Sequence, residues 1–238
     1  MVSQLFPLRL EEAELRRSGR MLVGPINLEL KGHGTTVIIG PNGAGKTSLL
    51  RLMHGIGRLG GGRIAWACPT EEAHSRQAFV FQTPIIMRRT VIDNLAYPLR
   101  LRGSSRGAAR LAAEEIAAST GLADTLGRQA LGLSGGEKQK LALARALILQ
   151  PEVLFLDEPC AALDGRATRE IEDVLKQVTA DGTSLIMTTH NLGQAQRLAR
   201  EVVFLLRGRV HEHGNAQGFF DAPSTPEGAA FLRGDIVE

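Results

Sequence analysis

The fold of this chain is decided by the stretch Gly40-Pro41-Asn42-Gly43-Ala44-Gly45-Lys46-Thr47. An apolar, β-branched run over 35–39 precedes it, and a helix-forming segment over 48–53 follows it. A strand, a glycine-rich turn and a helix are the context that G-x-x-x-x-G-K-[ST] needs to wrap a phosphate, since the glycines let backbone N–H groups face the anion. The sequence therefore predicts a phosphate loop. Its expected nucleotide contacts are Gly40, Pro41, Asn42, Gly43, Ala44, Gly45, Lys46, Thr47 and Ser48, with Thr47 also holding Mg²⁺.

The composition is that of an ordinary folded protein. With 238 residues, 43% hydrophobic and 22% charged, the chain has room for one large domain and is not disordered. Aromatic residues make up only 4%, which leaves few stacking platforms and disfavours a nucleic-acid partner. The basic excess of +3 is small, and we interpret it as scattered surface charge.

Several sequence features favour a cytoplasmic location. The two cysteines, Cys68 and Cys160, lie in unrelated contexts without the spacing of a disulfide framework or a zinc site. The N-terminal residues do not resemble a secretory signal. Apolar runs stay well below the roughly 20 residues of a membrane-spanning helix, so any work at a membrane would need a separate subunit.

Hydrophobic patterning predicts an α/β fold. Segments 8–15 and 26–30 alternate apolar and charged residues, which is typical of an antiparallel β element. Glycines 60–62 predict a turn before a short strand over 63–67, and the next buried strand is expected over 77–81. From 135 onward, helices alternate with nearly continuous apolar strands, which indicates a parallel sheet covered on both faces.

The segment between Pro84 and Gly132 shows no strand pattern. Residues 89–101 and 106–119 have helical spacing or helix-forming composition, and Gly121 ends the second segment. We therefore expect a single domain over 1–238, in which 84–134 form an inserted helical subdomain. The α/β core, with its mainly parallel sheet and the antiparallel β element, would then comprise 1–83 and 135–238.

Two carboxylates follow the apolar run over 153–156. The ends of parallel strands are where ligands bind, so Asp157 is suited to hold Mg²⁺ and Glu158 to polarise an attacking water. The alternative is that both residues simply end a strand and cap a turn. The phosphate loop favours the functional interpretation.

A second candidate anion site begins at Ser134. Ser134, Gly135 and Gly136 stand at a predicted helix start, where free N–H groups attract phosphate. Ser134 with Glu137 is also a capping box, and both interpretations can hold together. Because one ATP does not need two such cradles from one chain, the second would cover the γ-phosphate of ATP held by a partner copy.

These motifs, in this order, resemble those of the ATP-binding subunits of ABC transporters over essentially the whole chain. The phosphate loop is similar to the Walker A motif, 153–158 to Walker B and 133–137 to the LSGGE signature. Gln82 resembles the Q-loop glutamine, 161–164 the D-loop and His190 the switch histidine. The resemblance implies a P-loop NTPase fold with a RecA-like core, the cofactors ATP and Mg²⁺, and a homodimer enclosing two ATP molecules.

The resemblance also implies roles for single residues. Gln82 would sense Mg²⁺ and the attacking water, His190 would contact the γ-phosphate and hold Glu158 in place, and Asp164 would bridge the two sites of the dimer. Where the family usually has an aromatic residue that stacks on adenine, this chain has Arg16-Arg17-Ser18. Arg17 is therefore the expected adenine contact, with its guanidinium stacked on the base; the alternative is that the base is held only weakly.

Further similarities concern the transported solute. Residues 79–82, Arg88-Arg89, 97–99 and 231–237 resemble the tungstate-type oxyanion importers. Such importers imply an integral membrane permease, contacted here through residues 84–102, a solute-binding protein, and a peripheral place on the inner face of the membrane. Import of phosphate, molybdate or amino acids stays open. A non-transport ABC ATPase is the alternative from another class, disfavoured because no long coiled-coil insertion or tandem ATPase unit is present, and Glu158 and His190 disfavour a module that holds ATP without hydrolysing it.

Overall fold

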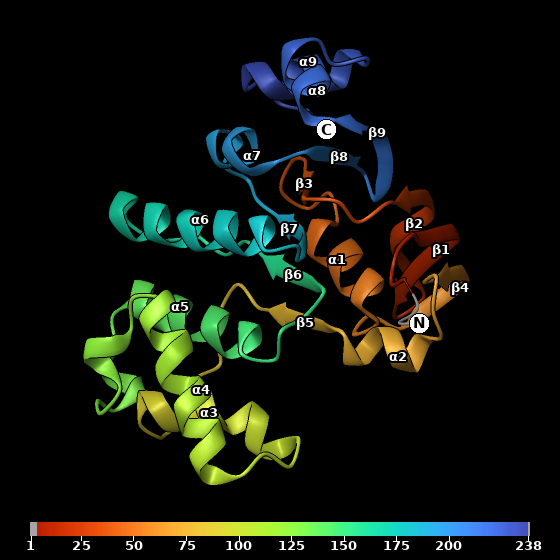
Figure 1. Cartoon of the computed structure of the whole chain (residues 1–238). Coiled ribbons are helices and arrows are strands. Elements are labelled where there is room, and N and C mark those ends of the chain that lie inside the picture. Colours follow the sequence, from red (N-terminus) through yellow and green to blue (C-terminus); the bar gives the residue numbers. More distant parts are fainter. Residues whose placement is uncertain (1–3, 238) are drawn as a thin grey trace.

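The chain is built around a six-stranded sheet in the order β5-β6-β7-β3-β8-β9, as the computed structural model, which describes residues 4–237, shows (Figure 1). Its strands are β3 (Thr35–Ile39), β5 (Gln77–Val80), β6 (Val153–Asp157), β7 (Ser184–Thr188), β8 (Glu201–Leu206) and β9 (Arg209–Asn215). The first five strands in the sheet order run parallel, and β9 returns antiparallel to β8. Every residue of β3, β6 and β7 is buried, as expected for parallel strands that are covered on both faces.

A smaller antiparallel sheet stands beside the first, in the order β2-β1-β4. It consists of β1 (Leu8–Arg17), β2 (Arg20–Leu30) and β4 (Leu59–Ala65). Its apolar residues join α1 (Lys46–His54) in one cluster against Ile38, Phe155 and Ile186 of the large sheet. One face of the large sheet is thus covered by α1 and the small sheet.

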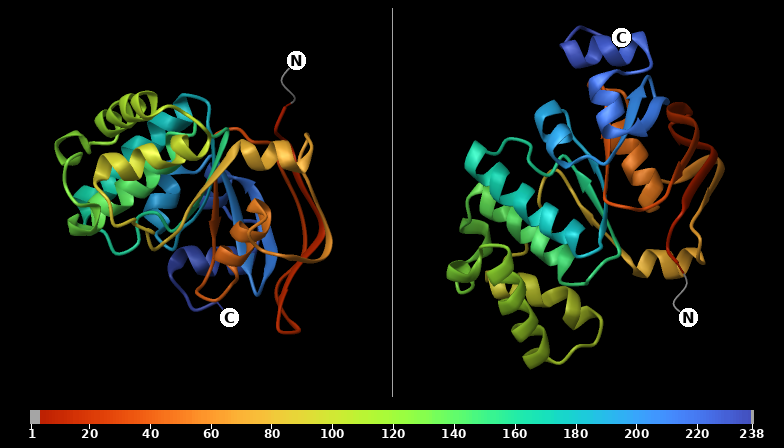
Figure 2. Two further views of the ribbon diagram at one scale, coloured as in Figure 1. Left: turned by 90° about the horizontal axis from the view of Figure 1, so that it is seen from below. Right: turned by 45° about the horizontal axis from the view of Figure 1, so that its top comes forward.

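The opposite face of the large sheet is covered by helices (Figure 2). The helices after the phosphate-loop helix are α2 (Thr70–Ser75), α3 (Val91–Leu101), α4 (Arg106–Ser119), α5 (Gly135–Leu147), α6 (Gly165–Ala180), α7 (Leu192–Leu198), α8 (Ala216–Asp221) and α9 (Pro226–Arg233). Side chains from α5 to α9 pack on Val37 and Ile39 of β3 and on their neighbours in the sheet. Ile38, which lies between these two residues in β3, faces the other side of the sheet. None of the helices formed by residues 4–237 is long and apolar enough to cross a membrane.

Helices α3 and α4 pack away from the large sheet. Ala109, Ala113 and Ala117 lie one turn apart on α4, and all three are fully buried in a cluster with α3 and one side of α5. The small side chains let the helices approach closely. The predicted α/β fold with a parallel sheet, an antiparallel β element and an inserted helical lobe is confirmed; the division at 84–134 stays a prediction.

The expectation of a turn at glycines 60–62 is wrong, because these residues lie inside β4. The pairing of β1 with β4 shifts register between Glu11 and Glu14, and Gly62 lies opposite that irregularity with φ of +74°. A Cβ there would meet the Glu12 carbonyl oxygen at 2.1 Å. Gly62 therefore serves a bulge in a strand, which the sequence pattern does not distinguish from a turn.

Two other elements differ from expectation. Strand β2 begins at Arg20 instead of Ile26. Gly24 interrupts the alternation of buried and exposed residues in its first half, which hid this part of the strand from the sequence pattern, and the Gly24 N–H donates to the Gly208 carbonyl. The short helix α2 was not expected, and β9 extends to Asn215 beyond the expected strand over 209–212. The other strands and helices lie within a few residues of their predicted positions.

We expect Phe155→Ala to lower the free energy of unfolding by about 3–5 kcal/mol, because the ring is 0% exposed between the two sheets. The matched control is Leu111→Ala on α4, where the side chain is 60% exposed and the change should stay within about 0.5 kcal/mol. Urea unfolding followed by circular dichroism measures both. Equal losses in the two variants would show that Phe155 is not central to the core.

Candidate functional site

The phosphate loop joins β3 to α1, and its glycines occupy positions that other residues could not. Gly40 has φ of +147°, and a Cβ there would meet the Leu205 carbonyl oxygen at 2.1 Å. Gly45 precedes α1 with φ of +100° and lies against Val23 of β2. The loop therefore lies between β8 and β2 and opens into a hollow of about 290 Å³. That hollow is lined by Asn42, Gly43, Gly45, Lys46, Thr47, Ser48 and Glu158.

Lys46 is a buried cation at the base of this hollow. Its Nζ donates to the carbonyl oxygens of Gly40 at 2.9 Å and Pro41 at 3.0 Å, so the loop wraps around its own lysine. Burial lowers the pKa of Lys46, and the carboxylates of Glu158 and Asp157 oppose this shift. An anion bound beside Lys46 would stabilise the charged form of its ammonium group, which burial disfavours.

Asp157 connects the phosphate loop to the large sheet. Its Oδ1 accepts hydrogen bonds from the hydroxyls of Thr47 at 2.8 Å and Thr188 at 2.9 Å. Its Oδ2 is buried and has no hydrogen-bond partner among residues 4–237; the guanidinium of Arg51 lies 3.7 Å away. A buried carboxylate oxygen without a partner, beside a threonine hydroxyl, fits the oxygen-rich coordination that Mg²⁺ prefers.

Glu158 turns away from the strand and faces His190. Its φ of +46° lies in the left-handed region, which non-glycine residues seldom adopt and which marks strain at functional sites. Its N–H donates to the Thr188 hydroxyl at 3.0 Å, so the ends of β6 and β7 hold each other. Glu158 Oε2 lies 2.8 Å from Nδ1 of His190. Because a carboxylate only accepts, Nδ1 carries the proton and Nε2 is left for another partner.

Ser134 and Gly135 lie at the surface, outside the hollow of their own phosphate loop. The Ser134 hydroxyl accepts from the N–H of Glu137, whose carboxylate accepts from the N–H of Ser134, so the capping box is present. The bond from the Ser134 backbone is the largest factor that lowers the pKa of Glu137. Gly136 packs so closely on α6 that a Cβ would lie 2.8 Å from Ala167.

The remaining predicted residues lie at three different places. Gln82 is exposed two residues beyond β5, whose Val80 pairs with Leu156 beside the two carboxylates. Asp164 caps α6, with Oδ1 accepting from the N–H groups of Arg166 and Ala167. Arg17 is exposed at the end of β1 and is not among the residues that line the hollow.

Sequence reasoning missed two supports of the site. The Thr188 hydroxyl bonds both Asp157 and Glu158. The sequence shows Thr188 at the end of an apolar strand, but it does not show that Thr188 holds the two carboxylate residues. Gly208, in the turn between β8 and β9, donates its N–H to the Ala44 carbonyl at 2.9 Å and accepts from Gly24. No sequence signal links these distant glycines.

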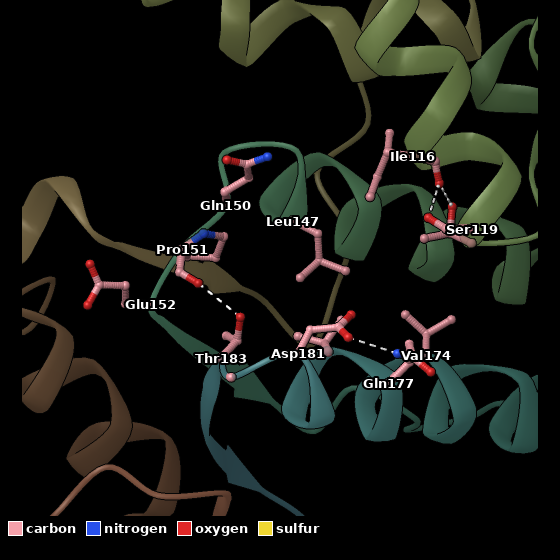
Figure 3. A pocket seen from close by; sticks show the side chains of 13 residues that line it. Ile116, Ser119, Leu147, Gln150, Pro151, Glu152, Val174, Gln177, Asp181 and Thr183 are labelled. Atoms are coloured by element: carbon pink, nitrogen blue, oxygen red, sulfur yellow. Dashed lines mark hydrogen bonds between the residues drawn. The ribbon is translucent and has the colours of Figure 1, made fainter.

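A larger cavity of about 550 Å³ lies elsewhere, between α4, α5 and α6 (Figure 3). Two of its polar side chains are paired locally: Gln177 donates to Asp181, and the Thr183 hydroxyl donates to the Pro151 carbonyl. Ile116, Leu147 and Val174 give it apolar walls. It lacks the convergent charges of the smaller hollow, and we therefore place the chemistry at the phosphate loop.

We expect Gly45→Ala to weaken ATP binding at least about tenfold, because a new Cβ would lie 2.7 Å from the Val23 side chain and displace the loop. Gly182→Ala is the matched control: its φ of +102° is nearly that of Gly45, but a Cβ there meets nothing within 4 Å. Both variants share the strain of a left-handed alanine. Calorimetric titration with ATP compares them, and equal affinities would show that the loop tolerates the side chain.

The comparisons with known proteins point in one direction. Residues 23–161, more than half of the chain, match the protein family described as ABC transporter. The phosphate import ATP-binding protein PstB of Mycoplasmoides gallisepticum is 34% identical over 229 residues, covering 89% of this chain and 70% of the relative. The tungstate uptake system ATP-binding protein TupC of Peptoclostridium acidaminophilum is 35% identical over 217 residues, covering 90% of this chain and 100% of the relative.

A solved structure shares the whole fold. CbiO1 of Clostridium perfringens, described as part of the ABC transporter complex cbiONQ, superposes with a TM-score of 0.83 at 26% identity and covers 97% of this chain and 96% of its own. The chain therefore belongs to the ABC transporter family, as an ATP-binding subunit that hydrolyses ATP for transport.

Proposed function

We propose that two copies of this chain enclose two ATP molecules and power uptake of an oxyanion. One observation carries the dimer: the exposed helix start at Ser134 lies outside the hollow that holds Lys46 and Glu158. Each hollow is then completed by a second copy. Ser134, Gly135 and Gly136 of that copy would cover the γ-phosphate, with the capping box keeping their N–H groups in place, and Asp164 would bridge the two sites.

Within one chain, the proposed roles follow from the contacts. Lys46 would release its two carbonyl partners to bind the β- and γ-phosphates. Thr47 and Asp157 would hold Mg²⁺, which neutralises phosphate charge when bound. Glu158, kept in place by His190, would orient and polarise the attacking water, and Gln82 would sense both water and metal.

The adenine contact is proposed for Arg17. Its guanidinium lies exposed at the end of β1, on the sheet that supports the phosphate loop through Val23 and Gly45. A planar guanidinium can stack on a base in place of an aromatic ring. The phosphate contacts would then supply most of the affinity.

The membrane partner is proposed to dock on residues 84–102, in the lobe that we assign to 84–134. A pocket of about 310 Å³ opens there between β5, α3 and α5, lined in part by Pro84, Ile85 and Pro98. Ile85 is 64% exposed, an apolar side chain available to a partner. The chain would thus work on the inner face of the membrane, bound to an integral permease, with a solute-binding protein and no nucleic acid in the system.

The solute is proposed to be tungstate or a related oxyanion. The relative named for tungstate uptake is matched over its full length, whereas the phosphate relative is covered to 70%. The resemblance in 79–82 and 231–237 supports the same choice. Phosphate, molybdate and amino acids are the competing solutes.

We expect Glu158→Gln to lower ATP turnover by about two orders of magnitude while ATP binding persists, because the general base is lost and Lys46 remains. The closed dimer should then accumulate in ATP. Size-exclusion chromatography with light scattering detects it, and Lys46→Ala, which should not bind ATP, is the control. A Glu158→Gln variant that stays monomeric with ATP contradicts the proposed dimer.

The choice of solute is tested with the permease and the solute-binding protein of the proposed system. Reconstituted in liposomes with its permease, the system should hydrolyse ATP faster when the binding protein carries tungstate, and Glu158→Gln should abolish the stimulation. Phosphate, molybdate and amino acids are offered in parallel. Stimulation by one of these but not by tungstate overturns the choice of solute and leaves the ATPase assignment intact.

A further inference from the structure

A buried ion pair joins α6 and α7, the helices that follow the segments carrying Glu158 and His190. Glu172 on α6 is 2% exposed, and its carboxylate accepts from Nε of Arg197 at 2.8 Å and from the terminal guanidinium nitrogen at 2.7 Å. Arg197 lies on α7, and half of its side chain remains in solvent. These bonds lower the pKa of Glu172 in spite of its burial. A buried carboxylate held by a two-pronged guanidinium fixes both distance and orientation between its helices.

Gln194 connects this ion pair to the segments that carry Glu158 and His190. It is fully buried, and its amide donates to Glu172 at 3.4 Å. Its backbone N–H donates to the side chain of Asn191, the residue directly after His190. Its side chain also lines a small hollow together with Cys160, two residues after Glu158, and with His190. The segments that carry Glu158 and His190 therefore both lie against one buried residue, Gln194.

Helix α7 depends on these contacts for its position. It runs only from Leu192 to Leu198, and a helix of about two turns is not stable by itself in water. His190 stands between β7, which is fixed in the large sheet, and this short helix. The orientation of the imidazole relative to Glu158, 2.8 Å away, thus depends on where α7 is held.

We propose that the Glu172–Arg197 pair, together with Gln194, is a positioning element that holds His190 against Glu158 during ATP hydrolysis. The proposal rests on the role of His190 given under Proposed function. None of the three residues lines the hollow of the phosphate loop, so their effect acts through His190 and not through contact with ATP.

Arg197→Lys tests this, because lysine keeps the charge but loses the two-pronged bond. We expect kcat to fall about tenfold, since small displacements of a catalytic group are costly, while KM for ATP and the affinity for a fluorescent ATP analogue stay unchanged. Arg233→Lys is the matched control: Arg233 also donates two hydrogen bonds to a carboxylate, both to Oδ2 of Asp235 in the exposed C-terminal segment, and kcat should not change.

A double-mutant cycle separates positioning from plain stability. In the His190→Ala background, Arg197→Lys should change kcat by less than about twofold, because the group that it positions is gone. Rates are normalised to the folded fraction, obtained from the amplitude of analogue binding. If Arg197→Lys does not fold, Glu172→Gln, which keeps the volume and weakens the same bonds, takes its place in the cycle.

The outcomes are distinct. An unchanged kcat in Arg197→Lys, or an equal loss with and without His190, overturns the positioning role and leaves the proposed function standing. Normal turnover in His190→Ala overturns the catalytic role of His190 and, with it, the proposal made here. Loss of kcat only where His190 is present supports the proposal.

Discussion

The carboxylate of Asp157 is the contact on which the site depends. It is 1% exposed at the end of β6 and receives the hydroxyls of Thr47 from the phosphate-loop helix and Thr188 from β7. Three elements far apart in sequence are thereby fixed at one point. A buried charge is tolerated only when it is well bonded. Its other oxygen, Oδ2, accepts no hydrogen bond from residues 4–237 and lies 3.7 Å from the Arg51 guanidinium, so a further cation here would stabilise the buried charge.

Helix α5 links this site to the helical lobe. One side of α5 packs Leu141, Ala144 and Ile148 with α3 and α4, and the other packs Leu143 and Leu147 against the large sheet. The helix that begins after Ser134 thus contributes side chains to both hydrophobic clusters. A force on α3 and α4 reaches the exposed start of α5 through packed side chains, since close-packed interiors transmit displacement instead of absorbing it.

The parts that local chemistry determines were predictable from the sequence. The phosphate loop needs its glycines in a fixed order, β3, β7 and β8 are nearly continuous apolar runs, and Asp164 caps a helix with an amphipathic pattern. Long-range geometry was not predictable. Glycines 60–62 gave the signal of a turn because a bulge and a turn both need positive φ, and only the partner strand tells them apart. The bonds of Glu172 to Arg197 and of Thr188 to Asp157 join residues 25 and 31 positions apart, beyond any local pattern.

The place of β3 in the sheet has a consequence for synthesis on the ribosome. β3 lies between β7 and β8, whose residues are synthesised about 150 positions later, and the Ala44 carbonyl of the loop accepts a hydrogen bond from Gly208. Contacts of such separation form slowly and only once both partners exist. The nascent chain therefore carries its nucleotide motif, complete in sequence, for most of translation without the structure that gives it affinity. Nucleotide cannot stabilise the early folding of this protein; it can act only on the nearly finished chain.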